Sequence, residues 1–335
     1  MFRTIIRILI IGLVGAAAAA AAYALWTPGA RETQGIHDVG SNGMWLGHGW
    51  IGDDGWFTRY RKKPALFRDP MRIQALSNQL KKYHITDIYP HLCPTDTDGN
   101  IPAVDPDQIE LFLDHCQGIR VMPWIGGILD THCFLQSPEW RKTFCASAVS
   151  LLEEHPRLAG VHVNIEPMPS GNQDFVVLLQ ELKNRMPPGK ILSVAAYPPT
   201  TWILPVISIH WGEEYYKAVS APVDQMAVMT YDSAAPMPKI YEHLMAAWTR
   251  DILTWAQDSE ILLGVPVYDD TGVLYHSPRV ENIRTALSGI HGGLHSFDRL
   301  PANYKGVAIY CEWEMEDWEW EYLGENFLSR LHVEQ

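Results

Sequence analysis

The sequence LAGVHVNIEP, residues 158–167, alternates apolar and polar side chains from Val161 to Glu166. Alternation with a period of two indicates a β-strand that carries His162, Asn164 and Glu166 on one face. Strands of helix-covered parallel sheets are normally apolar on both faces, so the polar face of this strand should point into the interior of a closed sheet. Burying three polar groups in a row costs free energy unless they are paired or functional. We therefore predict a barrel strand that ends in a functional carboxylate; the alternative is a polar network that only stabilises the barrel.

Eight β-rich runs of this kind occur along the chain, and helical patterns fill the gaps between them. Their starts lie roughly 30 to 45 residues apart, which is the size of a βα unit. This spacing predicts an α/β fold, a single (β/α)8 barrel with its site at the C-terminal ends of the strands. A doubly wound open sheet is the alternative, weakened because no G-x-G-x-x-G turn follows the first run. The runs are residues 44–49, 85–90, 119–125, 158–166, 191–197, 225–231, 261–268 and 305–310.

Helix signals stand where the barrel requires them. Ser137, Pro138 and Glu139 form an N-cap, a first-position proline and an acidic first turn. Two segments then repeat apolar residues with helical spacing. The apolar positions are Phe144, Ala148, Leu151 and Leu152 in the first segment, and Phe175, Leu178, Leu179, Leu182 and Met186 in the second.

The amino terminus is predicted to be a targeting segment, which separates the chain into residues 1–30 and a catalytic domain at 31–335. Arg3 and Arg7 precede a long uncharged stretch. Residues 22–24 read AYA, an A-x-A pattern that would allow signal cleavage after Ala24. Alternatively, residues 5–26 are long enough to span a bilayer as an uncleaved anchor, which the length of the apolar run favours. Either interpretation places the body outside the cytoplasm, in the periplasm or secreted.

Composition excludes several classes of function. The 335 residues carry a formal net charge of −13 and no basic run, so a nucleic-acid partner is not expected. The 13 Trp and 14 Tyr are a heavy aromatic load, which a carbohydrate site can use as stacking platforms. Five cysteines allow one or two disulfides or a set of buried thiols. Neither C-x-x-C nor H-E-x-x-H occurs, and we expect no metal and no organic cofactor.

The strand that ends in Glu166 resembles the signature of glycoside hydrolase family 18, the chitinases and their endo-acting relatives. That signature reads D-x-x-D-x-D-x-E, and Glu166 stands at its final, proton-donating position. Residues 229–232 read MTYD and match the family's M-x-Y-D motif on strand six. Residues 192–195, 263–268 and 306–310 are similar to its fifth, seventh and last strands. The resemblance spans most of residues 44–323 and implies the same barrel fold.

Three positions depart from that signature, because Asn164, His162 and Ala159 stand where the family has aspartates. Family 18 uses a substrate-assisted mechanism, in which the substrate's 2-acetamido oxygen attacks the anomeric carbon. The resemblance makes Glu166 the general acid and base, and it puts Asn164 where an aspartate orients the acetamide. An Asn-x-Glu pair of this kind is typical of glycoside hydrolase family 85. Tyr231 is expected to contact the acetamide carbonyl.

Further strand ends supply the expected sugar contacts. Asp232 follows Tyr231. His162 lies one strand step beneath Asn164; one interpretation is that it fixes the orientation of Asn164 at the sugar site, and the favoured alternative is a satisfied core histidine. Family 18 has a Trp on strand eight as the floor of the sugar site, where this chain has Tyr310 by direct register. The other expected contacts are Trp45, His91, Trp124, Tyr197 and Trp313, with His48 and Trp50 nearby.

These observations predict retaining hydrolysis of a β-linked glycan that contains N-acetylhexosamine. A non-catalytic chitinase-like glycan-binding protein is one alternative, favoured by the lost aspartates and opposed by the retained Glu166. A two-carboxylate retaining glycosidase is the other, although the strand-seven end offers only Asp269 and Asp270 as nucleophiles, with Glu312 and Glu314 near the last strand.

Overall fold

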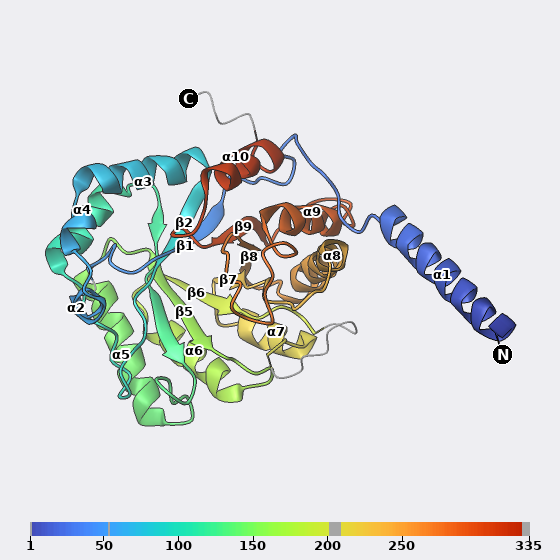
Figure 1. The fold of residues 1–335 in the computed structure, drawn as a ribbon. Helices are drawn as coiled ribbons and strands as arrows, with labels where there is room; N and C mark the ends of the chain where they lie inside the picture. The colour runs from blue at the N-terminus through green and yellow to red at the C-terminus, as the bar shows by residue number, and fades with distance from the viewer. Residues whose placement is uncertain (1, 53, 201–208, 330–335) are drawn as a thin grey trace.

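The structure is a computed structural model and describes residues 2–52, 54–200 and 209–329. Its strands gather at the centre and its helices surround them (Figure 1). Strand and helix alternate along the chain and every strand pair is parallel, so the predicted (β/α)8 barrel is confirmed. The strands are β1 Asn42–Leu46, β2 Ile85–Pro90, β3 Arg120–Val121, β4 Trp124–Ile128, β5 Gly160–Glu166, β6 Ile191–Ala196, β7 Gln225–Val228, β8 Glu260–Pro266 and β9 Tyr304–Tyr310.

The third predicted run forms two short strands rather than one. The sheet runs β3-β2-β1-β9-β8-β7-β6-β5-β4, so β3 pairs with β2 while β4 pairs with β5. Pro123 lies between them and has no N–H to donate to the ladder. The ring still closes at this point, because the Met122 N–H donates to the Ile88 carbonyl at 3.0 Å and the Leu92 N–H to the Trp124 carbonyl at 2.8 Å.

Helices pack around the barrel and cover its apolar outer face (Figure 1). The 3-10 turn Pro64–Leu66 joins α2 to α3. The helices are α1 Phe2–Leu25, α2 Asp54–Tyr60, α3 Pro70–Lys82, α4 Pro106–His115, α5 Pro138–Glu154, α6 Gln173–Arg185, α7 Glu213–Ser220, α8 Pro238–Trp255, α9 Ile283–Leu294 and α10 Asp317–Asn326.

Local signals in the sequence explain these helices. The Ser137 hydroxyl accepts the Trp140 N–H at 3.2 Å and caps α5, as its sequence predicts. Both predicted apolar stripes, on α5 and α6, are buried. The five cysteines are also buried, and no disulfide joins any two of them in the described chain.

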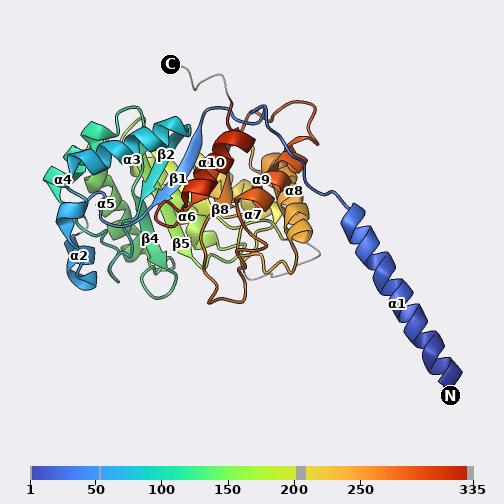
Figure 2. The ribbon, with the colours of Figure 1, turned by 45° about the horizontal axis from the view of Figure 1, so that its top comes forward.

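Helix α1 extends away from the barrel in both ribbon views (Figures 1 and 2). Its residues Ile6–Leu25 are long and apolar enough to cross a membrane, with a mean hydropathy of 2.3 and no burial against the barrel. The chain then returns to the barrel, where the Ala30 N–H donates to the Ser288 carbonyl at 2.9 Å. Lys239 of α8 donates to the Tyr23 and Ala24 carbonyls at 2.9 and 2.7 Å.

Candidate active site

A cavity of about 310 Å³ opens at the C-terminal ends of the barrel strands. Glu166 ends β5, Tyr310 ends β9, and the loop after β7 supplies Tyr231 and Asp232. The sequence-predicted residues that line it are Trp45, Asn164, Glu166, Tyr197, Tyr231, Asp232, Tyr310 and Trp313. The fold therefore brings residues from five strands and their loops to one hollow.

Asn164, Glu166 and Tyr197 form a hydrogen-bonded group in this cavity. The Asn164 amide donates to Oε1 of Glu166 at 2.6 Å, and the Tyr197 hydroxyl donates to Oε2 at 3.1 Å. Burial raises the pKa of Glu166, the two hydrogen bonds lower it, and the charge of Asp232 raises it, with a net rise. Tyr197, predicted to be a sugar contact, is thus bonded to the Glu166 carboxylate.

The other end of the Asn164 amide has no such contact. Its Oδ1 is buried and has no hydrogen-bond partner among the described residues. Only the NH2 end can donate to a carboxylate, so the contact with Glu166 fixes which end of the amide is the acceptor. A buried carbonyl oxygen without a partner is costly, and in a cavity wall it is ready to accept an N–H from a ligand.

Gly126 allows the backbone of β4 to approach this pair. It lies opposite Asn164 in the register of β4 and β5 and has a φ of 126°. A Cβ at this position would lie 2.2 Å from the Asn164 carbonyl oxygen. Only glycine fits both the conformation and the space.

Aromatic rings form the opposite wall of the cavity. The Tyr231 ring stacks on Tyr310 with centroids 5.3 Å apart, and Tyr268 stands edge-on to both. Burial is the first cause that raises the pKa of Tyr231 far above its usual value, so its hydroxyl stays protonated and can donate. Trp45 reaches the cavity with an exposed fraction of only 1%, because its ring packs against Tyr310.

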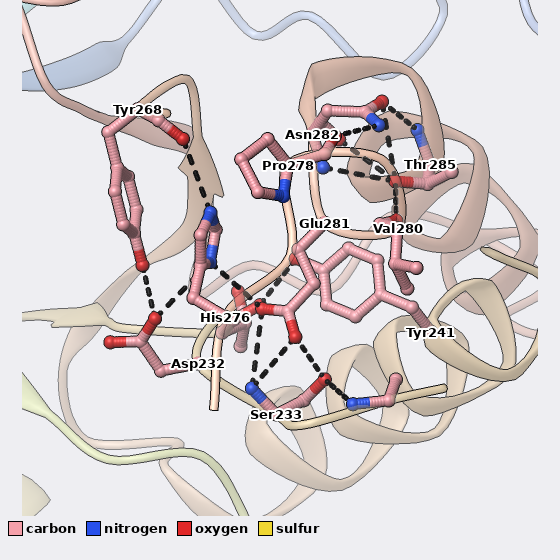
Figure 3. A network of polar contacts seen from close by, with 12 residues as sticks. Asp232, Ser233, Tyr241, Tyr268, His276, Pro278, Val280, Glu281, Asn282 and Thr285 are labelled. Atoms are coloured by element: carbon pink, nitrogen blue, oxygen red, sulfur yellow. Dashed lines mark hydrogen bonds and ion pairs between the residues drawn. The ribbon is translucent and has the colours of Figure 1, made fainter. Parts of the chain in front are cut away.

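Asp232 stands at the rim in a left-handed conformation, with a φ of 58°. The Tyr268 hydroxyl donates to its Oδ1, and Nδ1 of His276 lies 3.3 Å from the same oxygen (Figure 3). Oε2 of Glu281 lies 3.5 Å from the same nitrogen of His276. Sequence reasoning missed His276 and Glu281, which lie in the stretch between β8 and α9 and belong to no motif.

A second hollow of about 590 Å³ adjoins the first, because Tyr310 and Trp313 line both. Its wall includes a tilted ring pair, His91 and Trp124, with centroids 4.1 Å apart. These two predicted sugar contacts therefore lie in the second hollow, away from Glu166. Its other lining residues are Gly47, His48, Trp50, Trp56, Lys62, Phe67, Arg72 and Glu312.

His162 lines neither hollow, so it is not the predicted substrate contact, and its environment fits the alternative of a satisfied core histidine. Its side chain is fully buried beneath the cavity. Nε2 accepts the Trp45 indole N–H at 3.1 Å, so Nδ1 must donate to the Ser193 hydroxyl at 2.8 Å. Burial lowers the pKa of His162 to about 3, which keeps the imidazole neutral. This part of the polar face is structural.

A bonded series continues from Ser193 across the base of the barrel. The Ser193 hydroxyl donates to Oε1 of Gln225 at 2.8 Å, and the Gln225 amide donates to Asp87 at 2.6 Å. Arg120 closes the series with two bonds to Asp87, at 2.5 and 2.7 Å. Every member has a partner that suits its donor or acceptor role.

The family model for glycosyl hydrolases family 18 matches residues 107–298, which is more than half of the chain. The chain belongs to glycosyl hydrolase family 18. Membership makes this protein a glycoside hydrolase with a glycan as substrate, and it confirms the predicted resemblance. A search of curated proteins found no match.

Solved structures share the family 18 barrel at low sequence identity. The spore cortex-lytic enzyme SleL of Bacillus cereus has a TM-score of 0.55 at 14% identity, over 86% of this chain and 75% of that one. A chitinase from Bacteroides thetaiotaomicron gives 0.54 at 13%, over 86% and 97% of the two chains. The chitinase from Chromobacterium violaceum gives 0.52 at 16%, over 84% and 98%. At these identities the similarity shows the shared fold.

Proposed function

We propose that this family 18 member hydrolyses a β-linked glycan that contains N-acetylhexosamine, with retention and by a substrate-assisted mechanism. The observation that carries the proposal is the divided Asn164 amide, whose NH2 end is bonded to Glu166 while its Oδ1 is buried without a partner. A 2-acetamido group supplies the N–H that this oxygen lacks. Accepting that N–H turns the acetamide oxygen toward the anomeric carbon, where it acts as the nucleophile.

Glu166 is the general acid and then the general base in this proposal. A carboxyl group can protonate a leaving oxygen near neutral pH only if its pKa is raised, and burial raises the pKa of Glu166. The bonds from Asn164 and Tyr197 fix the direction of the carboxylate. After the aglycone leaves, the ionised Glu166 activates the water that opens the oxazolinium intermediate.

Asn164 fills the place of an aspartate without its charge. An amide orients the acetamide by hydrogen bonding but adds no negative charge beside the oxazolinium cation. Tyr231 donates its hydroxyl to the acetamide oxygen from the opposite wall, since it stays protonated. Asp232, whose carboxylate lines the same cavity, offers negative charge at the rim and an acceptor for a sugar hydroxyl.

The adjoining hollow supports a substrate of more than one sugar ring. Tyr310 and Trp313 lie where the two hollows meet, and Trp313 is 43% exposed. A glycan that crosses this boundary would stack one ring on each side of these residues. His91 and Trp124 then contact the part of the glycan that is remote from the cleaved bond.

We propose further that residues 31–335 form one catalytic domain and that α1 holds it at a membrane, with the barrel outside the cytoplasm. The length and hydropathy of Ile6–Leu25 support this arrangement. Lys239 binds the carbonyls of Tyr23 and Ala24, which are the last two residues of the A-x-A pattern. This contact between the helix end and the barrel favours an anchor that is not cleaved.

The proposal is tested by comparing turnover of two matched sets of substrates. The full chain in detergent is given aryl β-N-acetylglucosamine oligomers and the corresponding aryl β-glucosides, which lack the acetamide. We expect turnover of the first set alone, with the β-anomer of the product appearing first by ¹H NMR. Binding without turnover would indicate the glycan-binding alternative. Equal turnover of both sets would indicate a two-carboxylate mechanism.

A further inference from the structure

The group formed by Asp232, His276 and Glu281 is not explained by the reaction proposed above. We infer that His276 is a positioning residue of this site: as an imidazolium held between Asp232 and Glu281, it fixes the Asp232 carboxylate at the rim of the cavity and moderates the charge that Glu166 experiences (Figure 3). This inference rests on the proposed function of Glu166.

The orientation of the imidazole is fixed on two sides. Its Nε2 lies 3.2 Å from the Tyr268 carbonyl oxygen, which can only accept, so Nε2 carries a hydrogen. The ring also stacks on the Tyr268 ring, with centroids 4.1 Å apart and planes 18° apart. With Nε2 at the Tyr268 carbonyl, Nδ1 of His276 lies on the side of the two carboxylates, at ion-pair distance and without a hydrogen bond among the described residues.

The charge of His276 follows from what Nδ1 faces. Nδ1 lies 3.3 Å from Oδ1 of Asp232 and 3.5 Å from Oε2 of Glu281, and the side chains of His276 and Glu281 are fully buried. A lone pair on Nδ1 would repel both anions, whereas a proton there attracts both. Burial lowers the pKa of His276, but the two carboxylates outweigh it and raise the pKa to about 9.

The titratable groups near Asp232 and Glu281, besides His276, are the Glu166 carboxyl, whose pKa the charge of Asp232 raises, and the phenols of Tyr268 and Tyr241. Tyr268 donates to Asp232, and Tyr241 donates to the Thr230 carbonyl at 2.8 Å. Burial, their first cause, raises the pKa of both hydroxyls far above the usual value, so neither carries charge at neutral pH. His276 is thus the cation that faces Asp232 and Glu281 among these groups.

Glu281 fixes the backbone next to Asp232. It accepts the Ser233 N–H at 3.1 Å and the Ser233 hydroxyl at 2.8 Å. Asp232 itself has a left-handed φ of 58°, which costs a non-glycine residue free energy. Glu281 therefore fixes the backbone at Ser233, and His276 fixes the side chain of the preceding residue, Asp232.

The effect on catalysis has a defined sign. The charge of Asp232 raises the pKa of Glu166. An imidazolium beside Asp232 offsets that charge, so its removal should raise the pKa of Glu166 further. Removing Asp232 itself should lower it. The alkaline limb of kcat/KM reports this ionisation, because Glu166 must be protonated to act as the acid.

The experiment compares His276→Gln and Asp232→Asn in the full chain in detergent, on the N-acetylglucosamine oligomer. We expect His276→Gln to lower kcat/KM about 10- to 100-fold and to move the alkaline limb up by about one pH unit. Asp232→Asn should move the limb down. His155→Gln is the matched control, since His155 is also buried beside a carboxylate, with Nδ1 3.4 Å from Glu110. Unshifted limbs in both site variants would overturn the inference.

A second readout does not need turnover. The pKa of His276 is about 9 in the folded chain and near 6.5 in the unfolded chain, so protonation of His276 stabilises the fold. This stabilisation is complete below pH 6.5 and is lost as pH rises through about 9. The unfolding midpoint of the wild type should exceed that of His276→Gln most at pH 6 and least at pH 10. A difference in unfolding midpoint that does not change with pH would contradict the assignment of His276 as an imidazolium. So would stoichiometric binding of Zn²⁺, titrated alone, that His276→Gln abolishes. An inactive wild type would refute the proposed function, while this readout would still test the charge.

Discussion

Strand β5 crosses both the base and the rim of the barrel interior, and its polar side chains are hydrogen-bonded differently at the two levels. At the base, His162 is bonded on both ring nitrogens, and the bonds continue without a gap to Arg120. At the rim, Asn164 uses one end of its amide and leaves the other buried without a partner. A complete network stabilises a fold, whereas an incomplete one at a cavity is a place for a ligand.

The polar stripe of β5 has two interpretations that the sequence alone does not distinguish. A stripe of three polar residues was compatible with a stabilising network or with an active site. In the structure His162 belongs to the network, whereas Asn164 and Glu166 face the cavity, as the proposed function requires. Substitutions at the rim should therefore lower activity, whereas substitutions at the base should lower stability.

The largest effect is expected from Glu166→Gln. Losing the proton donor and the later base should lower kcat/KM about 10⁴-fold, with the unfolding midpoint little changed. Initial rates on the N-acetylglucosamine oligomer give the first value and thermal unfolding gives the second. Glu325→Gln, an exposed position on α10, is the control. Residual activity within tenfold of the wild type would remove Glu166 from the mechanism.

Asn164 provides the next test. Asn164→Ala removes the acetamide contact and should lower kcat/KM about 10²-fold. Asn164→Asp keeps an acceptor and adds a negative charge beside Glu166, which raises the pKa of that acid. Its alkaline limb should then move up by about one pH unit. If Asn164→Ala keeps kcat/KM near the wild-type value and Asn164→Asp does not shift the limb, Asn164 does not orient the substrate.

Trp313 tests the boundary between the two hollows. Trp313→Ala should raise KM for oligomers about tenfold by removing a stacking face, and kcat should change little. Trp318→Ala is the matched control, because Trp318 is similarly exposed, at 37% against 43%, yet lines neither hollow. Steady-state kinetics on short and long oligomers would show the difference. Equal effects of the two substitutions would argue against a substrate that crosses the boundary.

The smallest effect on activity is expected at the base. Ser193→Ala leaves the Nδ1–H of His162 without its acceptor and should lower the free energy of unfolding by about 1–3 kcal/mol. Denaturant titration measures this loss, and kcat/KM should stay near the wild-type value. A large loss of activity with unchanged stability would mean that the base and the rim are not separate.

Much of the fold was predictable from the sequence, because it follows from local patterns. Alternation at residues 161–166 predicted a strand and its inward face, and the N-cap at Ser137 predicted the start of α5. The interruption at Pro123 was less visible, since residues 119–125 read as one β-rich run. A proline removes a single ladder bond, and only the paired neighbours show where the strand divides.

The sequence by itself determined the barrel, the inward stripe and the carboxylate at its end, since period and spacing are properties of the chain alone. The tertiary structure decided which inward residues are satisfied and which are not. His162 meets Trp45 from β1, and His276 and Glu281 reach Asp232 across a long stretch of chain. Hydrogen-bond partners and neighbouring charges come from residues remote in sequence, so only the folded chain determines whether a buried polar group has a structural contact or is left to bind a ligand.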